Sequence, residues 1–149
     1  MHILVISGPN LNLLGRREPA VYGLVTLEQI HARLKAEAEG LGCTLECFQS
    51  NHEGALIDSL QAHMDSADGA LLNPGGLTHT SVSLHDAVKS MPFPVIEVHL
   101  SHLHQREEWR QRSVIAAATR AQVMGFGWLG YLVALRGLVG ILRQDTPEG

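Results

Sequence analysis

Residues 3–23 read ILVISGPNLNLLGRREPAVYG and contain two contrasting parts. The first part, Ile3 to Ile6, is an apolar run whose length and β-branched content are typical of a buried strand. The second part begins with Ser7-Gly8-Pro9-Asn10, a sequence that favours a turn. The stretch therefore predicts a strand near the start of the chain that ends abruptly in a polar loop.

The connection that follows this strand is long and polar. It contains Asn10, Arg17 and Tyr22, and glycines at positions 15 and 23 bracket its second half. A structureless connection of about fifteen residues exceeds the usual two to six between a strand and a helix, and long connections are more often functional. Ligands bind at the carboxyl ends of the strands in open parallel sheets, so we expect this loop to form one wall of a site. A plain surface connection is the alternative.

Apolar runs and amphipathic segments alternate along the rest of the chain. This alternation predicts an α/β fold, a flavodoxin-like three-layer sandwich with a five-stranded parallel sheet. We expect a single catalytic domain over residues 1–149 with a frayed tail at 143–149. Thr26, with Gln29 three residues later, has the pattern of a helix N-cap. The predicted strands are 3–6, 43–49, 70–72, 95–98 and 121–124, and the predicted helices are 27–38, 56–64, 82–90 and 130–142.

Composition and charge limit the class of protein. A chain of 149 residues that is 45% hydrophobic is long enough for one well-packed core. The formal charge of −4 gives no electrostatic reason to bind nucleic acid or an anionic membrane. No leader peptide is recognisable and no apolar run reaches the ~20 residues that span a bilayer, so we expect a cytoplasmic protein. Cys43 and Cys47 fall on one face of a predicted strand, which favours packed thiols over a metal or redox pair.

The sequence argues against several kinds of cofactor site and catalytic motif. GFGWLG at 125–130 matches G-x-G-x-x-G, but no later strand can offer an acidic residue to a ribose, so we interpret these glycines as close strand–helix packing. His99 and the pair His102 and His104 alternate in direction along an extended strand end, and we expect no metal site there. Only two lysines occur and G-x-S-x-G is absent, which argues against Schiff-base chemistry and serine hydrolysis.

The polar groups that remain at the predicted strand ends fit proton transfer. Tyr22 has arginines close by in the sequence, Glu97 precedes His99 by two residues, and Asn10 and Asn73 offer amides. Such groups suit removal of a proton next to a carbonyl, with hydrogen-bond donors for the developing oxyanion. Two alternatives remain open: a flavodoxin-like binding or signalling module without chemistry, and a lyase or isomerase that acts on another cyclic hydroxy-ketone.

Five segments follow one another over nearly the whole chain: GPNLNLLGRREPAVYG (8–23), QSNHEG (49–54), NPGGLTHTS (73–81), IEVHLS (96–101) and REEWR (106–110). Together, and in this order, they resemble the type II 3-dehydroquinate dehydratases. The resemblance implies a flavodoxin-like subunit that uses no cofactor or metal. It also implies dehydration of 3-dehydroquinate, a small-molecule substrate, to 3-dehydroshikimate through an enolate, in the shikimate route or in quinate breakdown.

The resemblance also implies roles for individual residues. Tyr22 corresponds to the base that removes the proton next to the ketone, and Arg17 to the residue that favours the tyrosinate and the enolate. His99 corresponds to the acid that protonates the departing hydroxyl, Glu97 to the residue that orients it, and Asn10 to the residue that holds a water against the enolate oxygen. At pH 7 only about one free phenol in a thousand is ionised, so a phenolic base needs cations beside it. The expected substrate contacts are Asn73, His79, Leu100, Ser101, Arg106 and Arg110.

Assembly is the last implication of the resemblance. The family usually forms trimers packed into a dodecamer, in which Asp86 corresponds to an acidic residue that reaches a neighbouring subunit's site. Two positions depart from the family pattern, which commonly has asparagine where this chain has Ser7 and His102. Neither position carries a proton transfer, so the expected activity is unchanged, while the hydrogen bonding around the site and the trimer contact are open.

Overall fold

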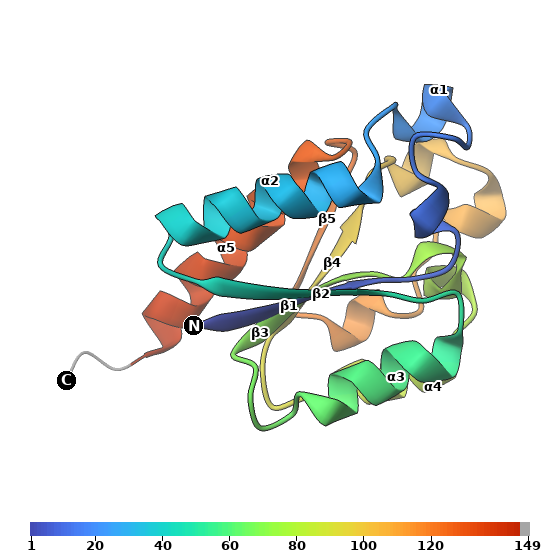
Figure 1. Ribbon diagram of the computed structural model, residues 1–149. Helices are drawn as coiled ribbons and strands as arrows, with labels where there is room; N and C mark the ends of the chain where they lie inside the picture. Colours follow the sequence, from blue (N-terminus) through green and yellow to red (C-terminus); the bar gives the residue numbers. More distant parts are fainter. Residues whose placement is uncertain (147–149) are drawn as a thin grey trace.

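A five-stranded parallel sheet lies between two layers of helices in the computed structural model, which describes residues 1–146 (Figure 1). The strand order is β2-β1-β3-β4-β5, which is the flavodoxin order, and the predicted three-layer α/β sandwich is confirmed. The strands are β1 (His2–Ser7), β2 (Thr44–Gln49), β3 (Gly69–Asn73), β4 (Val95–His99) and β5 (Ala121–Met124).

Alternate residues of the central strands enter two separate cores. Ile3 and Val5 pack with α2 (Leu27–Gly40) and α5 (Leu129–Asp145), while Leu4 and Ile6 face the opposite side of the sheet. That side is covered by α3 (Glu53–Ala62) and α4 (Val82–Lys89), as Figure 1 shows. A strand covered on both faces reads as a continuous apolar run, which is why β1 was recognisable from the sequence. The remaining elements are α1 (Pro19–Tyr22) and the short 3-10 turns η1 (Leu11–Leu13), η2 (Gly75–His79), η3 (Leu103–Gln105), η4 (Glu108–Arg110) and η5 (Ala116–Ala118).

Helix α2 begins at the predicted N-cap. The Thr26 side-chain oxygen accepts a hydrogen bond from the Gln29 amide at 3.2 Å, and the Gln29 side chain accepts one from the Thr26 amide at 3.0 Å. This reciprocal capping box satisfies two amides that the first helical turn leaves free. It fixes the point at which the chain leaves the polar loop and returns to the α/β core.

The structure corrects several predicted boundaries. The connection after β1 is not structureless, because η1 and α1 lie within it. Strand β2 begins at Thr44 rather than Cys43, and β3 and β4 are slightly longer than predicted. Helix α5 continues through Asp145, so residues 143–145 are helical rather than frayed; residues 147–149 of the predicted tail lie outside the described residues.

The loops that follow β1 and β3 touch each other closely. The Gly8 amide donates a hydrogen bond to the Asn73 carbonyl at 2.8 Å. A Cβ atom at Gly8 would lie 2.4 Å from the carbonyl oxygen of Pro74, a clash with backbone that only glycine avoids. Gly75 has φ +61°, and a Cβ there would lie 2.9 Å from the Pro9 carbonyl. Glycine at these two positions therefore lets the two strand-end loops form one continuous wall.

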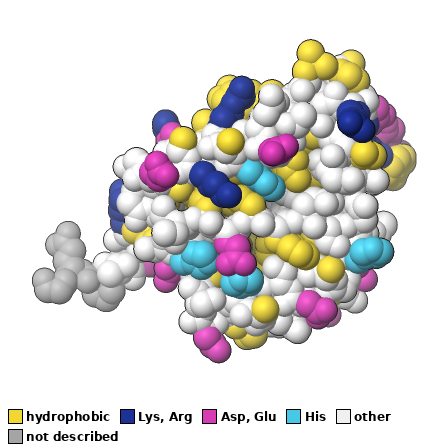
Figure 2. Space-filling view, viewed as in Figure 1, with side chains coloured by type: hydrophobic (Ala, Val, Ile, Leu, Met, Phe, Trp, Pro, Cys, Tyr) yellow, Lys and Arg dark blue, Asp and Glu magenta, His cyan; other side chains and the backbone are white. Residues whose placement is uncertain are grey.

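Charged side chains on the face in Figure 2 are interspersed rather than gathered into one patch of a single sign. At the β2 edge, His2 and His63 flank Glu46, with nitrogen–oxygen distances of 3.4 and 3.1 Å. Among residues 1–146, no helix has the length and apolar content to cross a membrane. Over the same part of the chain, no three His, Cys, Asp or Glu side chains are arranged as ligands for one metal ion.

Candidate active site

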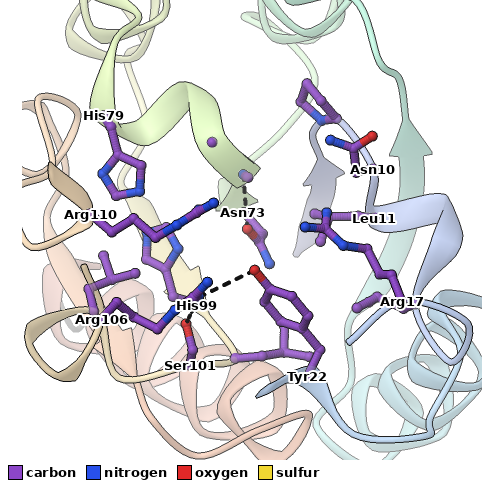
Figure 3. A pocket seen from close by; sticks show the side chains of 16 residues that line it. Asn10, Leu11, Arg17, Tyr22, Asn73, His79, His99, Ser101, Arg106 and Arg110 are labelled. Carbon is purple, nitrogen blue, oxygen red and sulfur yellow. Dashed lines mark hydrogen bonds between the residues drawn. The ribbon is translucent and has the colours of Figure 1, made fainter. Parts of the chain in front are cut away.

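One pocket opens at the carboxyl ends of the strands, and it gathers the sequence-predicted residues (Figure 3). All of them line it except Glu97, which lies behind His99, and Asp86, which lies elsewhere. Pro9, Leu11, Leu14, Gly75, Gly76 and Leu103 also line the pocket and were not predicted. The predicted residues in its wall are Asn10, Arg17, Tyr22, Asn73, His79, His99, Leu100, Ser101, Arg106 and Arg110.

Tyr22 is the last residue of the short helix α1, and its hydroxyl points into the pocket (Figure 3). Pro19 occupies the first turn of this helix, where a missing amide hydrogen costs nothing, and Gly23 ends it with φ +80°. The preceding residue, Glu18, has the left-handed value φ +37°. The helix thus stands between two sharp backbone turns that hold Tyr22 over the strand ends.

Two guanidinium groups lie beside the Tyr22 side chain. Arg106 donates a hydrogen bond from Nη1 to the Tyr22 hydroxyl oxygen at 3.3 Å, and the same nitrogen donates to Ser101 Oγ at 3.0 Å. The guanidinium carbon of Arg17 lies 4.9 Å from the centre of the Tyr22 ring. The Tyr22 hydroxyl that faces the pocket therefore lies beside two cations.

His99 and Glu97 form a buried pair at the end of β4. His99 Nε2 lies 2.5 Å from Glu97 Oε2, and the two residues are 5% and 0% exposed. Burial acts to raise the pKa of Glu97, but the hydrogen bond and charge of His99, with hydrogen bonds from Ser113 and Gln122, outweigh it and hold that pKa below its usual value. Glu97 is therefore an anion that holds the imidazole in one orientation.

Three further side chains donate hydrogen bonds to the Glu97 carboxylate, and they were not among the predicted site residues. Thr78 donates to Oε2 at 2.9 Å, Ser113 donates to Oε1 at 2.8 Å, and the Gln122 amide donates to Oε2 at 2.9 Å. Gln122 pairs with Glu97 in the β4–β5 register, so a polar residue in that short strand was a usable signal. Thr78 and Ser113 come from η2 and from the segment after η4, and only the fold brings them together.

The Asn73 side chain is fixed at the floor of the pocket. Its Oδ1 accepts a hydrogen bond from the Gly75 amide at 3.1 Å, and its Nδ2 donates to the Tyr131 hydroxyl at 3.2 Å. Burial raises the pKa of Tyr131 above its ordinary value, although the hydrogen bond with Asn73 acts in the opposite direction. Tyr131 therefore stays a neutral phenol that orients the Asn73 amide.

His79 and Arg110 line the far side of the pocket. His79 donates from Nδ1 to the Arg112 carbonyl at 2.8 Å, which leaves Nε2 available to a ligand. Arg110 forms an ion pair with Glu107 at 2.7 Å, and its guanidinium carbon lies 4.1 Å from the centre of the Trp109 ring. These contacts fix an imidazole and a guanidinium that suit the hydroxyl and carboxylate groups of a small polar ligand.

Asn10 and Asp86 occupy contrasting positions. Asn10 lines the pocket and has the left-handed backbone conformation, with φ +69°. Its backbone N–H donates a hydrogen bond to Asn51 Oδ1 at 3.0 Å. Asp86 lies on α4 outside the pocket, 70% of its side chain is exposed, and it contacts His85 at 3.0 Å. His102 and His104 are exposed, and their rings meet edge to face with centroids 5.6 Å apart.

The pocket therefore combines a phenol, a buried imidazole–carboxylate pair and positive charge. The phenol of Tyr22 stands beside two guanidinium groups, and the imidazole of His99 stands against a buried carboxylate. Asn73 and Asn10 add amide groups that can bind an oxyanion or a water. Such a set can remove a proton next to a carbonyl and protonate a leaving group.

Comparisons with known proteins agree with this chemistry. The family model described as dehydroquinase class II matches residues 1–139. The chain is 56% identical over 144 residues to the 3-dehydroquinate dehydratase of Roseiflexus castenholzii, covering 97% of this chain and 92% of that protein. It is 51% identical over 142 residues to the 3-dehydroquinate dehydratase of Bacillus cereus, covering 95% and 97%.

Solved structures give the same result for the fold. The type II dehydroquinase of Butyrivibrio crossotus superposes with a TM-score of 0.91 at 41% identity, covering 93% of this chain and 97% of that one. The type II dehydroquinase of Propionibacterium acnes gives 0.90 at 36% identity, covering 93% and 96%. Sequence, fold and pocket therefore lead to one conclusion, that this chain belongs to the class II dehydroquinase family.

Proposed function

We propose that this chain is a 3-dehydroquinate dehydratase, a lyase that converts 3-dehydroquinate to 3-dehydroshikimate and water in the shikimate pathway. Its membership of the class II dehydroquinase family and the names of its relatives support this activity. The pocket offers the required chemistry, because the reaction removes a proton next to a ketone and expels a hydroxyl from the adjacent carbon. The enzyme acts as a single catalytic domain.

Tyr22 begins the proposed reaction as a phenolate. It takes the proton from the carbon next to the ketone, and the electron pair of that bond moves toward the carbonyl oxygen to form an enolate. Arg106 and Arg17 stabilise the phenolate before the transfer. Asn10 then holds a water against the enolate oxygen, so negative charge meets a hydrogen-bond donor as it develops.

His99 completes the proposed reaction as the acid. The enolate re-forms the ketone, a carbon–carbon double bond appears, and the hydroxyl on the adjacent carbon leaves with the proton of His99 as water. Glu97 balances the imidazolium charge before this transfer and keeps the ring oriented. Asn73, His79, Leu100, Ser101 and Arg110 hold the carboxylate and hydroxyl groups of the substrate. The Tyr22 proton returns to His99 through solvent, which restores the starting state.

One observation carries this proposal: the phenol beside two arginines and the imidazole backed by a buried carboxylate line the same pocket. A direct test mixes the protein with 3-dehydroquinate and follows the ultraviolet absorbance of the conjugated enone. We expect the absorbance to rise, with the same rate in the presence of a chelator because only side chains act. No rise with the folded wild-type protein would refute the proposed activity.

The proposal extends to assembly as trimers packed into a dodecamer, with Asp86 reaching a neighbouring subunit's site. The exposure of Asp86 on α4, outside its own pocket, supports this. Mixed oligomers of Tyr22→Phe and Asp86→Ala subunits test it after dissociation and reassociation. A site with Tyr22 intact would receive Asp86 from its neighbour, so activity should exceed that of either variant alone. Additive activity in the mixture, or a monomer in sedimentation, would refute the shared site.

A cytoplasmic location completes the proposal. Cys43 and Cys47 are both free thiols, which is typical of proteins in a reducing compartment. Fractionation of cells that produce the protein tests this, because the dehydratase activity should appear with cytoplasmic markers. Recovery with the membrane or external fraction would contradict it.

A further inference from the structure

Thr78 lies at the centre of the hydrogen bonds around the catalytic pair. It is fully buried on η2, directly before His79. Its Oγ1 lies 2.9 Å from Glu97 Oε2, 3.4 Å from His99 Nε2 and 3.0 Å from Ser113 Oγ. Its carbonyl accepts a hydrogen bond from the Val114 amide at 2.7 Å.

The hydroxyl proton of Thr78 has one destination. Ser113 directs its own proton to Glu97 Oε1 at 2.8 Å, and its oxygen accepts from the amides of Ile115 and Ala116 at 3.2 and 3.0 Å. A hydroxyl has one donor and two acceptor positions, so Ser113 has no place left for the Thr78 proton. His99 Nε2, 3.4 Å away, faces the Glu97 anion at 2.5 Å and is itself a donor, so Thr78 must donate to Glu97 Oε2.

The carboxylate that Thr78 holds determines which nitrogen of His99 carries a proton in the neutral ring. Glu97 accepts from Thr78, Ser113 and Gln122 and remains an acceptor, so the His99 Nε2 atom facing it must be N–H. The lone pairs of Thr78 Oγ1 face the same N–H from 3.4 Å. The proton that His99 gives up must then leave from Nδ1.

We propose that Thr78 is a positioning residue for the dehydration: its hydroxyl holds the Glu97 carboxylate against His99 Nε2 and thereby commits Nδ1 of His99 to proton delivery. This inference rests on the proposed function for its kinetic consequence. Its structural consequence, the Nε2–H form of His99, is independent of substrate.

Other charged groups near His99 do not replace this contact. Arg106 and Arg110 come from the segment after β4, His79 from η2 and Tyr22 from α1, and all of them line the pocket. From β5, the uncharged Gln122 reaches Glu97 rather than His99. Among the described residues, Glu97 and Thr78 are thus the side chains that contact Nε2.

Two variants test the role. Thr78→Val keeps the shape and loses the hydroxyl, whereas Thr78→Ser keeps the hydroxyl. In Thr78→Val we expect kcat to fall about tenfold or more, because the acid is misdirected, while KM changes less than about threefold. The acid limb of the kcat/KM profile should move to higher pH, because a carboxylate that has lost a donor is protonated more easily. Thr78→Ser should have the wild-type kcat and the wild-type position of the acid limb.

Two kinetic results would overturn the inference. One is a Thr78→Val profile with the wild-type kcat and the wild-type acid limb. The other is a uniform loss at every pH that Thr78→Ser does not restore, which is the pattern of general structural damage. Melting curves of both variants establish that each is folded before the comparison.

Nitrogen-15 NMR of His99 separates this inference from the proposed activity. In wild-type protein without substrate, we expect the neutral ring to be protonated at Nε2, and Thr78→Val should introduce the Nδ1–H form. A wild-type ring with a bare Nε2 overturns the inference even if Thr78→Val does not fold. If the protein shows the Nε2–H form but does not convert 3-dehydroquinate, the proposed activity is refuted. The inference that Thr78 and Glu97 fix the proton of His99 is then still supported.

Discussion

Nη1 of Arg106 lies 3.3 Å from the hydroxyl oxygen of Tyr22, although 84 positions separate the two residues in the chain. Tyr22 ends the short helix α1 after β1, and Arg106 follows β4 and η3. The guanidinium also donates to Ser101 Oγ at 3.0 Å, which fixes its position independently of the tyrosine. The parallel sheet thus places a fixed cation at the hydroxyl oxygen of the proposed base.

Arg106→Ala should lower kcat at least about tenfold, because the phenolate loses the guanidinium that contacts its oxygen. Arg106→Lys should lose less, since it keeps the charge but not the two-fold hydrogen bonding. Steady-state kinetics with 3-dehydroquinate measure both. Arg120→Ala, at an exposed arginine that pairs with Asp145, is the matched control and should keep the wild-type rate. Equal rates for Arg106→Ala and wild type would contradict the role of Arg106.

Glu97→Gln should change the pH dependence of stability. The pKa of Glu97 is lower in the folded protein than in the unfolded chain, so its contribution is present above the ordinary glutamate range and is lost as pH falls through the folded pKa. Melting temperatures from pH 7 to 3 should therefore fall more steeply below about pH 4.3 in wild type than in Glu97→Gln. Parallel curves for the two proteins would show that Glu97 has no lowered pKa.

Tyr131→Phe should change stability in alkali. Because burial raises the pKa of Tyr131 in the folded protein, the unfolded chain ionises first, and stability falls as pH rises above about 10. The variant lacks this ionisation, so its melting temperature should decline less between pH 9 and 11. An equally steep decline in Tyr131→Phe would contradict the buried neutral phenol.

The sequence revealed the sheet and most of the pocket for physical reasons. Strands such as β1 are covered on both faces and read as apolar runs, and parallel strands bring their following loops to one edge. Asn10, Asn73 and His99 follow or end strands, so their meeting in one pocket could be expected. Periodicity could not assign Tyr22 and Arg110 to the pocket. These two residues were predicted from the resemblance of segments 8–23 and 106–110 to a known family.

Two of the donors around Glu97 were beyond the reach of the sequence. Thr78 lies on η2 and Ser113 in the connection between η4 and η5, and ordinary polar residues in such positions carry no mark of a shared partner. Gln122 was different, because it is a polar residue in a short strand that pairs with β4. Helix α1 was missed because its four residues, Pro19–Tyr22, are too few to show a helical period. The end of α5 was misplaced because Gln144 and Asp145 are polar residues that continue an exposed helix as readily as they end one.

The most direct test of the account is the turnover of Tyr22→Phe, which removes one oxygen and leaves the ring between the same arginines. We expect the rate of enone formation from 3-dehydroquinate to fall by about 100-fold or more, the usual loss for a general base, while calorimetry shows that the substrate still binds. A folded Tyr22→Phe protein that retains more than about a tenth of the wild-type kcat would contradict Tyr22 as the base.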